Sequence, residues 1–389
     1  NAAIVQQLDK IAHSTMLGLA NVPSILLAKR LVNMTPPGLT KVFYSDAGAT
    51  AVEIALKMSF QYWQQQNDPN LRRKKKYLSL GEAYHGDTIG SVSLGGMDLF
   101  NDLFRDLLFS GYRACHPYCY RCSLNLEQDK CGLACVDAVE DIMSKHHEEL
   151  AAMIVEPLVQ GAAGMIIAPK GYLRRIRELC TKYNILLIAD EVAVGFGRTG
   201  TMFACEQEDV CPDLICLAKG LTGGYLPLAA TLTSERIYEA FLGEHKTLRA
   251  FSHGHTYTGN PLGCVAALAN LDLFEKNDLL THVHNLARVM AEQLERFHEL
   301  AHVGDIRQRG LMVGIELVRN KQTKEAYLWE ENIGHQVILE ARKHGLIIRP
   351  LGSVIVLMPI LNISESQLME ILNITYQAIK TVTERNEMG

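Results

Sequence analysis

The fold is decided by a stretch that begins Ile185-Leu186-Leu187-Ile188-Ala189-Asp190-Glu191 and ends Leu214-Ile215-Cys216-Leu217-Ala218-Lys219-Gly220. Each end of this stretch is an apolar run that is too short for an ordinary helix and lacks strict alternation. Each run is therefore typical of a strand buried on both faces of a parallel sheet. A glycine-rich turn, Gly195-Phe196-Gly197-Arg198-Thr199-Gly200, lies between them. Ligands of open parallel sheets bind beyond the carboxyl ends of the strands, so we expect Asp190 and Lys219 in one crevice.

A carboxylate and an amine at such strand ends suit an enzyme that uses pyridoxal phosphate (PLP). The amine of Lys219 would form a Schiff base with PLP, and Asp190 would pair with the pyridinium nitrogen to keep the ring an electron sink. Each residue also has an ordinary interpretation, because strands often end in Asp and a Lys after an apolar run is often a surface residue. Their spacing and the flanking glycines favour the cofactor site.

Composition narrows the class of protein. A chain of 389 residues, 48% hydrophobic and 21% charged, suits a large globular enzyme of two or three domains. A net charge of -5 and a pI near 6.3 give no reason to expect nucleic acid or an anionic membrane as a partner. No apolar run reaches the length of a membrane span. Ten cysteines in a chain of this length favour a reducing cytoplasm over a disulfide scaffold.

The start of the chain carries no signal-peptide pattern. Its first residue is Asn1, and a helical pattern begins directly after it. We expect that an N-terminal segment precedes the sequence given.

Strand and helix patterns alternate over most of the chain, which predicts a doubly wound α/β domain with a mostly parallel sheet. The strands of this domain are predicted at residues 41–45, 77–80, 152–155, 185–189 and 214–218. Farther on, a strand pair at 303–317, a helix at 333–344, strands at 346–349 and 354–358 and a terminal helix from Ser364 predict a small α+β domain. We therefore place the large domain at 1–300 and the small C-terminal domain at 301–389.

Two loops after predicted strands suit a cofactor. Asp46-Ala47-Gly48-Ala49 joins a strand to a helix, and the free N–H groups of a first helical turn bind anions, so we assign the cofactor phosphate here. A plain turn is the alternative. In Tyr84-His85-Gly86-Asp87-Thr88 the ring of Tyr84 can stack on a planar cofactor. Ordinary loop packing is the alternative there.

Three further segments suggest ligand contact. Glu156-Pro157 ends a strand, and residues 159–164 after it are interpreted as a flexible loop at the same sheet edge. Residues 253–261 form a long polar loop, either at the ligand or as a surface loop that caps the next helix. Arg349 stands beside a tight turn and suits a carboxylate clamp, although Arg before Pro is often a solvent-facing residue.

A cysteine-rich loop spans residues 115–135. The pairs Cys119 with Cys122 and Cys131 with Cys135 are compatible with four thiolates around zinc or an iron–sulfur cluster. The second interval is not a standard one, so reduced loop thiols are the preferred interpretation and no metal is predicted.

These motifs in this order resemble the class III aminotransferases of the fold type I PLP family, and the resemblance covers the whole chain. It is carried by four segments: Ala189-Asp190-Glu191-Val192, the turn 195–200, Ala218-Lys219-Gly220, and residues 256–261. A closer resemblance, to the branch of this class that works in biotin synthesis, rests on residues 84–88, 159–161, 253–256 and 349–352.

The resemblance implies a role for each candidate residue around PLP. Lys219 would hold PLP and then move a proton between the substrate carbon and the cofactor carbon. Asp190 would pair with the ring nitrogen, Val192 would pack on the ring face, and Tyr84 would lie near the ring and the substrate. The N–H groups of Gly48 and Ala49 would bind the phosphate, and Glu156 and Gln160 would lie near the cofactor hydroxyl.

The resemblance also implies a homodimer with shared active sites. Gly254, His255 and Thr256 would come from the partner subunit, with Thr256 on the phosphate, and Arg349 would take the carboxylate of the keto acid. The implied reaction is ping-pong: a donor amine loads the cofactor, and 8-amino-7-oxononanoate leaves as 7,8-diaminononanoate. The donor is S-adenosylmethionine or lysine, and residues 14–21 and the cysteine-rich insertion look closer to lysine-using members.

Two other functions stay open. One is a class III aminotransferase that acts on ornithine, 4-aminobutyrate or a diamine. The other is a PLP-binding protein without turnover, since a fold alone does not determine activity.

Three departures from the family pattern bear on the site. The usual phosphate turn has hydroxyl residues where this chain has Ala47 and Ala49, and each lost hydrogen bond is worth about 1 kcal/mol or more. Val194 stands where Thr is usual. The N-terminal segment of the family, which closes over the substrate, is not in the sequence given.

Overall fold

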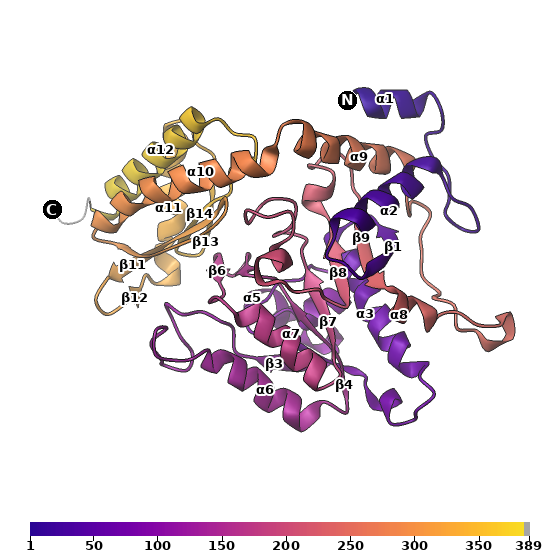
Figure 1. Ribbon diagram of the computed structural model, residues 1–389. Helices are drawn as coiled ribbons and strands as arrows, with labels where there is room; N and C mark the ends of the chain where they lie inside the picture. The colour runs from indigo at the N-terminus through magenta and orange to yellow at the C-terminus, as the bar shows by residue number, and fades with distance from the viewer. Residues whose placement is uncertain (385–389) are drawn as a thin grey trace. The chain divides into compact units, whose positions relative to one another are not determined.

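The computed structural model of the chain describes residues 1–384, except for the side chains of residues 99 and 100 (Figure 1). The described chain forms two compact units. The first consists of Asn1–Leu158, Ala168–Phe196 and Met202–Asn277. The second consists of Val159–Ile167, Gly197–Thr201 and the chain from Asp278 onward. The second unit therefore begins before the expected boundary at residue 301 and includes two short segments from the middle of the chain.

The first unit contains a seven-stranded sheet in the order β1-β9-β8-β7-β4-β2-β3. Its strands are β1 (Leu39–Ser45), β2 (Lys76–Leu80), β3 (Tyr112–Ala114), β4 (Leu150–Val155), β7 (Leu186–Asp190), β8 (Leu214–Leu217) and β9 (Ala229–Ser234). β9 runs antiparallel to both of its neighbours, and the pairs from β8 to β3 are all parallel. The prediction of a mostly parallel α/β sheet is confirmed.

Central and edge strands differ as their sequences predict. Every residue of β4, β7 and β8 is buried, which explains why each is a continuous apolar run. The edge strand β1 exposes Thr40, and the edge strand β3 exposes Arg113. The last residues of β7 and β8 are thus buried in the core of the first unit.

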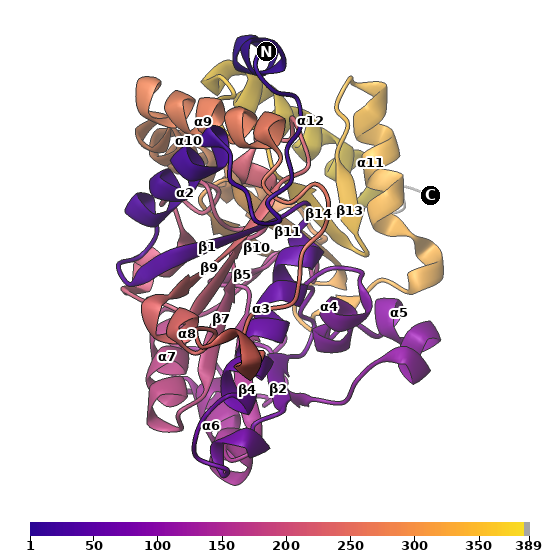
Figure 2. The same ribbon diagram turned by 90° about the vertical axis from the view of Figure 1, so that its right-hand side faces the viewer.

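Helices cover both faces of this sheet. α3 (Gly48–Gln64) buries Ala51, Val52, Ala55 and other apolar residues against β4, β8 and β9. α7 (Tyr172–Lys182) packs on β7 and against α6 (Ala134–His146), on the other side of the sheet in Figure 2. The other helices of this unit are α1 (Ala2–Leu8), α2 (Val22–Met34), α4 (Ile89–Leu94), α5 (Asp98–Asn101), α8 (Glu235–Glu239) and α9 (Pro261–Lys276), with the short helices η1 (Leu71–Arg73), η2 (Asp102–Leu107), η3 (Ala204–Glu208), η4 (Lys219–Leu221) and η5 (His245–Thr247).

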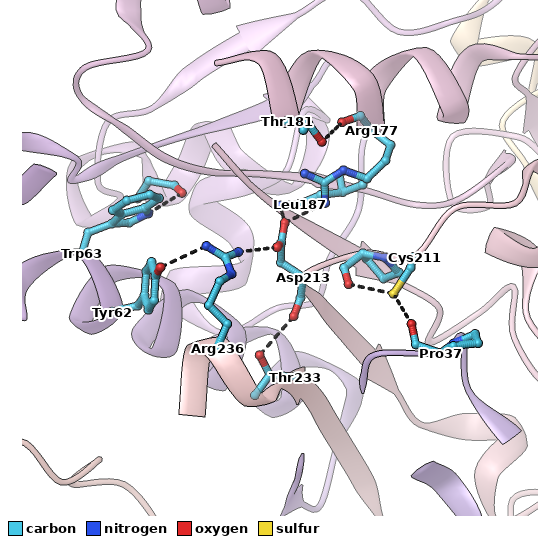
Figure 3. A network of polar contacts seen from close by, with 12 residues as sticks. Pro37, Tyr62, Trp63, Arg177, Thr181, Leu187, Cys211, Asp213, Thr233 and Arg236 are labelled. Carbon is cyan, nitrogen blue, oxygen red and sulfur yellow. Dashed lines mark hydrogen bonds and ion pairs between the residues drawn. The ribbon is translucent and has the colours of Figure 1, made fainter. Parts of the chain in front are cut away.

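A polar network fastens the amino ends of β7 and β8 (Figure 3). Asp213, directly before β8, accepts hydrogen bonds from the Arg177 guanidinium at 2.7 Å, the Arg236 guanidinium at 2.7 Å and the Leu187 N–H at 2.8 Å. Arg236 also donates to the hydroxyl of Tyr62 at 3.0 Å, which connects α8 with α3. The network therefore connects the amino ends of β7 and β8 with α7 through Arg177 and with α8 through Arg236.

The second unit is a small α+β fold, as predicted. Its antiparallel sheet has the order β10-β11-β14-β13, with β12 paired to β11, and the strands are β10 (Val303–Arg309), β11 (Met312–Asn320), β12 (Glu325–Ala326), β13 (Arg349–Leu351) and β14 (Val354–Leu357). The helices are α10 (Leu279–Leu294), α11 (Ile333–Lys343) and α12 (Glu365–Thr383), with η6 (Glu295–Glu299) and η7 (Trp329–Glu331). The predicted strand pair at 303–317 is confirmed, whereas the strand predicted at 346–349 was placed too early, because pairing with β14 begins only at Arg349.

The segment after Glu156 corrects one prediction. Residues 159–164 are not a flexible loop of the large domain: β5 (Val159–Gln160) and β6 (Ile166–Ile167) form a hairpin that belongs to the second unit. The buried Arg307 donates to the carbonyl of Gly164 at 2.8 Å and pairs with Glu316 at 2.6 Å. A guanidinium more than a hundred residues away thus satisfies the backbone of this turn, and no local pattern can show such a contact.

Among the residues described, no helix combines the length and the apolar character that a membrane crossing requires.

Candidate active site

The sheet register brings Asp190 and Lys219 to the same edge of the first unit. Asp190 ends β7 and pairs with Cys216 of β8, and Lys219 is the second residue after the end of β8. Lys219 has a φ of 41°, which is unusual for a residue with a side chain, and its side chain is exposed. Local strain of this kind occurs preferentially at functional sites, where the surrounding structure holds it.

The turn after Lys219 is held by two neighbours. Asn270 of α9 donates from its side-chain amide to the carbonyl of Gly220 at 2.8 Å and to the carbonyl of Leu221 at 3.2 Å. A Cβ atom on Gly220 would lie 2.7 Å from the Cβ of Phe196, so only glycine allows this approach. These contacts define the path of the backbone at Lys219.

The carboxylate of Asp190 is buried and oriented from two sides. Its Oδ2 atom lies 2.8 Å from Nδ1 of His85, and its Oδ1 atom accepts the N–H of Val192 at 3.1 Å. The side chains of His85 and Asp190 are 0% and 5% exposed. A carboxylate can accept but not donate, so the imidazole carries its proton on Nδ1 and donates to Asp190. Hydrogen bonds to a charged, buried acceptor are among the stronger ones in proteins.

Three segments from different strand ends converge on the amino end of α3. A Cβ on Gly48, the first residue of α3, would lie 2.6 Å from the side chain of Val192. A Cβ on Gly86, which has a φ of 122°, would lie 2.5 Å from the Cβ of Ala49. The loops after β1, β2 and β7 therefore meet here through small residues, and the first-turn N–H groups of α3 lie beside the loop that follows Asp190.

Tyr84 and Glu156 complete this group. The N–H of Tyr84 donates to Oε1 of Glu156 at 3.1 Å, and its hydroxyl donates to Oδ2 of Asp87 at 2.8 Å. Burial, the hydrogen bond to Asp87 and the negative charges of Asp87, Asp190 and Glu156 together raise the pKa of Tyr84 to about 12. The phenol therefore stays protonated at neutral pH and acts as a hydrogen-bond donor.

These residues fit PLP. The buried carboxylate of Asp190 suits a pyridinium nitrogen, the amine of Lys219 suits an aldehyde, and a helix amino end suits a phosphate. Ala47, the residue before α3, offers no side-chain hydrogen bond to the helix. The hydroxyl of Thr50 is engaged with Ala47 and Asp46 at distances of 2.8 to 3.1 Å. A phosphate at this turn would therefore have to be bound by backbone N–H groups.

The polar loop at 253–256 lies along α3 in the same chain. Nζ of Lys57 is 3.0 Å from Nδ1 of His253, and Nε2 of His255 is 3.7 Å from Oδ1 of Asp46. Burial, together with the charges of Lys57 and His255, lowers the pKa of His253. Thr256 is exposed. The loop is therefore close to the residue that precedes the phosphate turn, while the side chain predicted to bind phosphate faces outward from this chain.

Two predicted site residues belong to the second unit. Arg349 begins β13 and is exposed, and Gln160 lies buried in β5.

The cysteine-rich loop forms a small cavity in the first unit. It is lined by Cys119, Cys122, Cys131, Cys135 and His116, and all ten cysteines of the chain are free thiols. In the described part of the chain, no three His, Cys, Asp or Glu side chains are arranged so that they could hold a metal ion.

His85 is the site residue whose role sequence reasoning missed. It is part of the segment 84–88 that carries the resemblance, but its position gave no indication of its partner. His85 and Asp190 are 105 positions apart and meet only because β2 and β7 both flank β4. The sequence offered one indication: His85 comes directly after Tyr84, in the loop that follows β2, and the carboxyl end of β2 lies at the same edge of the sheet as the carboxyl end of β7.

Comparison with known proteins agrees with this geometry. The chain matches the aminotransferase class-III family over residues 1–379. It is 55% identical over 387 residues to an adenosylmethionine-8-amino-7-oxononanoate aminotransferase of Nitratidesulfovibrio vulgaris, covering 100% of this chain and 71% of that protein. It is 51% identical to the protein of the same name from Geobacter sulfurreducens, covering 98% of this chain and 84% of the relative.

Two solved structures share the fold. The first is the adenosylmethionine-8-amino-7-oxononanoate aminotransferase of Methanocaldococcus jannaschii, with a TM-score of 0.92 and 46% identity, covering 98% of this chain and 84% of that one. The second is an amine transaminase from an uncultivated Pseudomonas species in its PLP-bound form. It has a TM-score of 0.93 and 36% identity, and covers 98% of this chain and 86% of that one.

Proposed function

The chain belongs to the class-III aminotransferases, and we propose that it uses PLP to transfer an amino group to the keto acid 8-amino-7-oxononanoate, in the synthesis of biotin. The observation that carries the proposal is the buried Asp190 carboxylate, oriented by His85 and Val192, at the same sheet edge as Lys219. The keto acid is the one named for the relatives described above.

Each part of PLP would be held by a different element. The N–H groups of Gly48 and Ala49 would bind the phosphate, Asp190 would face the ring nitrogen, and Lys219 would provide the covalent link. When bound, PLP supplies an electron sink that lets a carbon next to the substrate amine lose a proton. Val192 would pack on the ring, and Tyr84 would lie beside it.

The protein's own contribution is to orient groups and to move one proton. Asp190 stays in position because His85 and the N–H of Val192 hold both of its oxygens. The amine of Lys219, placed by a turn that Asn270 fixes, would carry the proton between the two carbons. Tyr84, whose hydroxyl remains protonated, would donate a hydrogen bond rather than act as a base. Glu156 would hold the backbone of Tyr84 in place.

The substrate carboxylate and the second subunit are further parts of the proposal. Arg349 would bind the carboxylate of the keto acid, since a guanidinium presents two parallel donors to a carboxylate. Gln160 would lie near the cofactor hydroxyl. Gly254, His255 and Thr256 would act on the partner's site in a homodimer, and the exposure of Thr256 and of Tyr257, at 63%, supports this. We also propose a cytoplasmic location, supported by ten free thiols.

The proposed amino donor is S-adenosylmethionine, because the relatives described above are named for it. Lysine is the second donor to test. A second candidate function is transfer to the acceptors of amine transaminases, because the solved amine transaminase has the same fold at a TM-score of 0.93.

A turnover assay tests the function. Protein saturated with PLP is mixed with 8-amino-7-oxononanoate and one donor, and 7,8-diaminononanoate is measured by mass spectrometry. We expect product with S-adenosylmethionine, and none for Lys219→Ala. Lys182→Ala, which changes an exposed lysine that pairs with Glu140, should retain activity. Turnover confined to ω-amine substrates would favour the second candidate, and full activity of Lys219→Ala would refute the assigned chemistry.

A further inference from the structure

We infer that Glu53 is a positioning residue that fastens the Tyr84–Ser91 segment to α3 and so places Tyr84 and His85 at the cofactor; this rests on the proposed function. Glu53 lies in α3, one helical turn after Ala49, and residues four apart share a helix face. Ala49 belongs to the phosphate turn, so the same face of α3 carries both the phosphate turn and Glu53.

One carboxylate oxygen of Glu53 collects three hydrogen bonds from the segment. Oε1 accepts the hydroxyl of Thr88 at 2.5 Å, the N–H of Gly90 at 2.8 Å and the N–H of Ser91 at 3.3 Å. Glu53 is half-buried, so these bonds are partly shielded from water.

These bonds replace the ordinary cap of a helix. Thr88 precedes α4, and Thr at this position usually accepts a bond from the N–H two or three residues later. Here Thr88 makes no such cap, and Glu53, 37 residues away from Gly90, accepts both N–H groups instead. The start of α4 is therefore attached to another helix and not only to its own cap residue.

Two glycines allow the close approach. A Cβ on Gly90 would lie 2.1 Å from Oε2 of Glu53, and a Cβ on Gly86 would lie 2.5 Å from the Cβ of Ala49. The segment thus contacts α3 at two points, Ala49 against Gly86 and Glu53 against Gly90. The two points are four residues apart in α3 and also four residues apart in the segment. Contact at two points prevents both sliding and rotation of the segment along the helix.

The fastened segment begins with the two residues that face the cofactor site. His85 lies directly before Gly86 and donates to Asp190 at 2.8 Å, while Tyr84 binds Glu156 through its N–H at 3.1 Å. Hydrogen bonds weaken steeply with distance and angle, so a shift of the segment would loosen the imidazole that orients Asp190. Glu53 does not reach these residues itself and acts through Thr88, Gly90 and Ser91, which it holds.

The test compares Glu53→Ala with Glu53→Gln. The glutamine keeps an oxygen that can accept from the N–H groups of Gly90 and Ser91, whereas the alanine removes the acceptor. Glu235→Ala is the matched control: Glu235 is an exposed carboxylate in the first turn of a short helix, paired with Lys41 at 3.0 Å, at the opposite edge of the sheet. Thr88→Val is a milder second variant that removes one donor, in case Glu53→Ala does not fold.

Three readouts separate positioning from general stability. Hydrogen–deuterium exchange of the protein without PLP reports residues 84–94 directly, visible circular dichroism of bound PLP reports the ring environment, and kcat and KM report turnover. For Glu53→Ala we expect faster exchange confined to residues 84–94, a weaker dichroic band, and a kcat that falls by up to about a hundredfold. Glu53→Gln should restore all three, and Thr88→Val should lie between.

The inference would be overturned if the exchange rates, the dichroic band and the kcat of Glu53→Ala all lay within about twofold of the values for the protein without substitutions. So would a uniform rise in exchange over the whole first unit, since that means general destabilisation. If Glu53→Ala does not fold, unchanged exchange in Thr88→Val overturns the inference equally. If the protein without substitutions shows no transaminase turnover but Glu53→Ala still alters the exchange, the proposed function is refuted. The positioning role of Glu53 is then still supported.

Discussion

Removing His85 should reveal how strongly the protein holds the carboxylate of Asp190. The contact is a 2.8 Å hydrogen bond between side chains that are 0% and 5% exposed. His85→Ala leaves the buried Asp190 with one fewer donor and does not change the N–H of Val192 on its other oxygen.

The expected magnitude follows from burial and charge. A hydrogen bond to a charged group contributes about 1.5–3 kcal/mol to the free energy of unfolding. The single substitution also removes the packing of the imidazole ring, so the change in the free energy of unfolding is larger than the contribution of the hydrogen bond alone. A double-mutant cycle of His85→Ala with Asp190→Ala cancels the packing contributions and isolates the coupling between the two side chains. We expect a coupling free energy of about 1.5–3 kcal/mol.

Urea unfolding of the protein without PLP measures the cycle. The chain has two tryptophans, and Trp63 is buried in the first unit whereas Trp329 is 73% exposed in the second. In a Trp329→Phe background, fluorescence therefore reports the unit that contains the site. This matters because two units need not unfold together. A second cycle, His85→Ala with Asp213→Ala, is the control, since Asp213 lies at the opposite edge of the sheet.

The control cycle should give a coupling within about 0.5 kcal/mol of zero. A coupling between His85 and Asp190 that is equally small would refute the reasoning, because it would mean that the imidazole does not hold the carboxylate.

Three further predictions concern single residues. Arg349→Ala should lower the rate of the keto-acid half-reaction by at least about tenfold, because a charge-assisted hydrogen bond to the substrate carboxylate is lost, and should leave the half-reaction with the amino donor unchanged. Stopped-flow measurement of the two half-reactions checks this. An equal loss in both would contradict the proposal that Arg349 binds the keto-acid carboxylate. Ala47→Ser supplies the missing cap of α3 and should stabilise the chain by about 0.5–2 kcal/mol in urea unfolding; a lower stability would show that the turn has no room for a hydroxyl. Burial raises the pKa of Glu191 from 4.5 to about 7, although the N–H groups of Ala204 and Cys205 donate to it. The folded chain then holds a proton that the unfolded chain has lost, so the free energy of unfolding should fall as pH rises from 4.5 to about 7. Glu191→Gln should flatten this part of the pH profile, and an unchanged slope would argue against the raised pKa.

The central strands of the large sheet were predictable because their evidence is local, whereas the three-residue edge strand β3 was not predicted. β4, β7 and β8 are buried on both faces, and burial on both faces requires the continuous apolar runs that their sequences show. The exception, the hairpin at 159–167, is held by Arg307 from β10. A turn that depends on a distant guanidinium looks like a flexible loop when only its own residues are considered.

The placement of Asp190 and Lys219 at one edge of the sheet was likewise predictable before the fold was known. Side-chain type and position at a strand end are properties of the chain itself, and parallel strands of one sheet deliver their carboxyl ends to one edge. Which residues orient that chemistry depends on distances across the fold. His85 meets Asp190 over 105 positions, and Glu53 meets Gly90 over 37, through the order of the strands and the absence of side chains at Gly86 and Gly90. Periodicity determines local structure because it reflects burial of successive residues, whereas hydrogen bonds between distant elements depend on packing within a few tenths of an ångström, which only the tertiary structure decides.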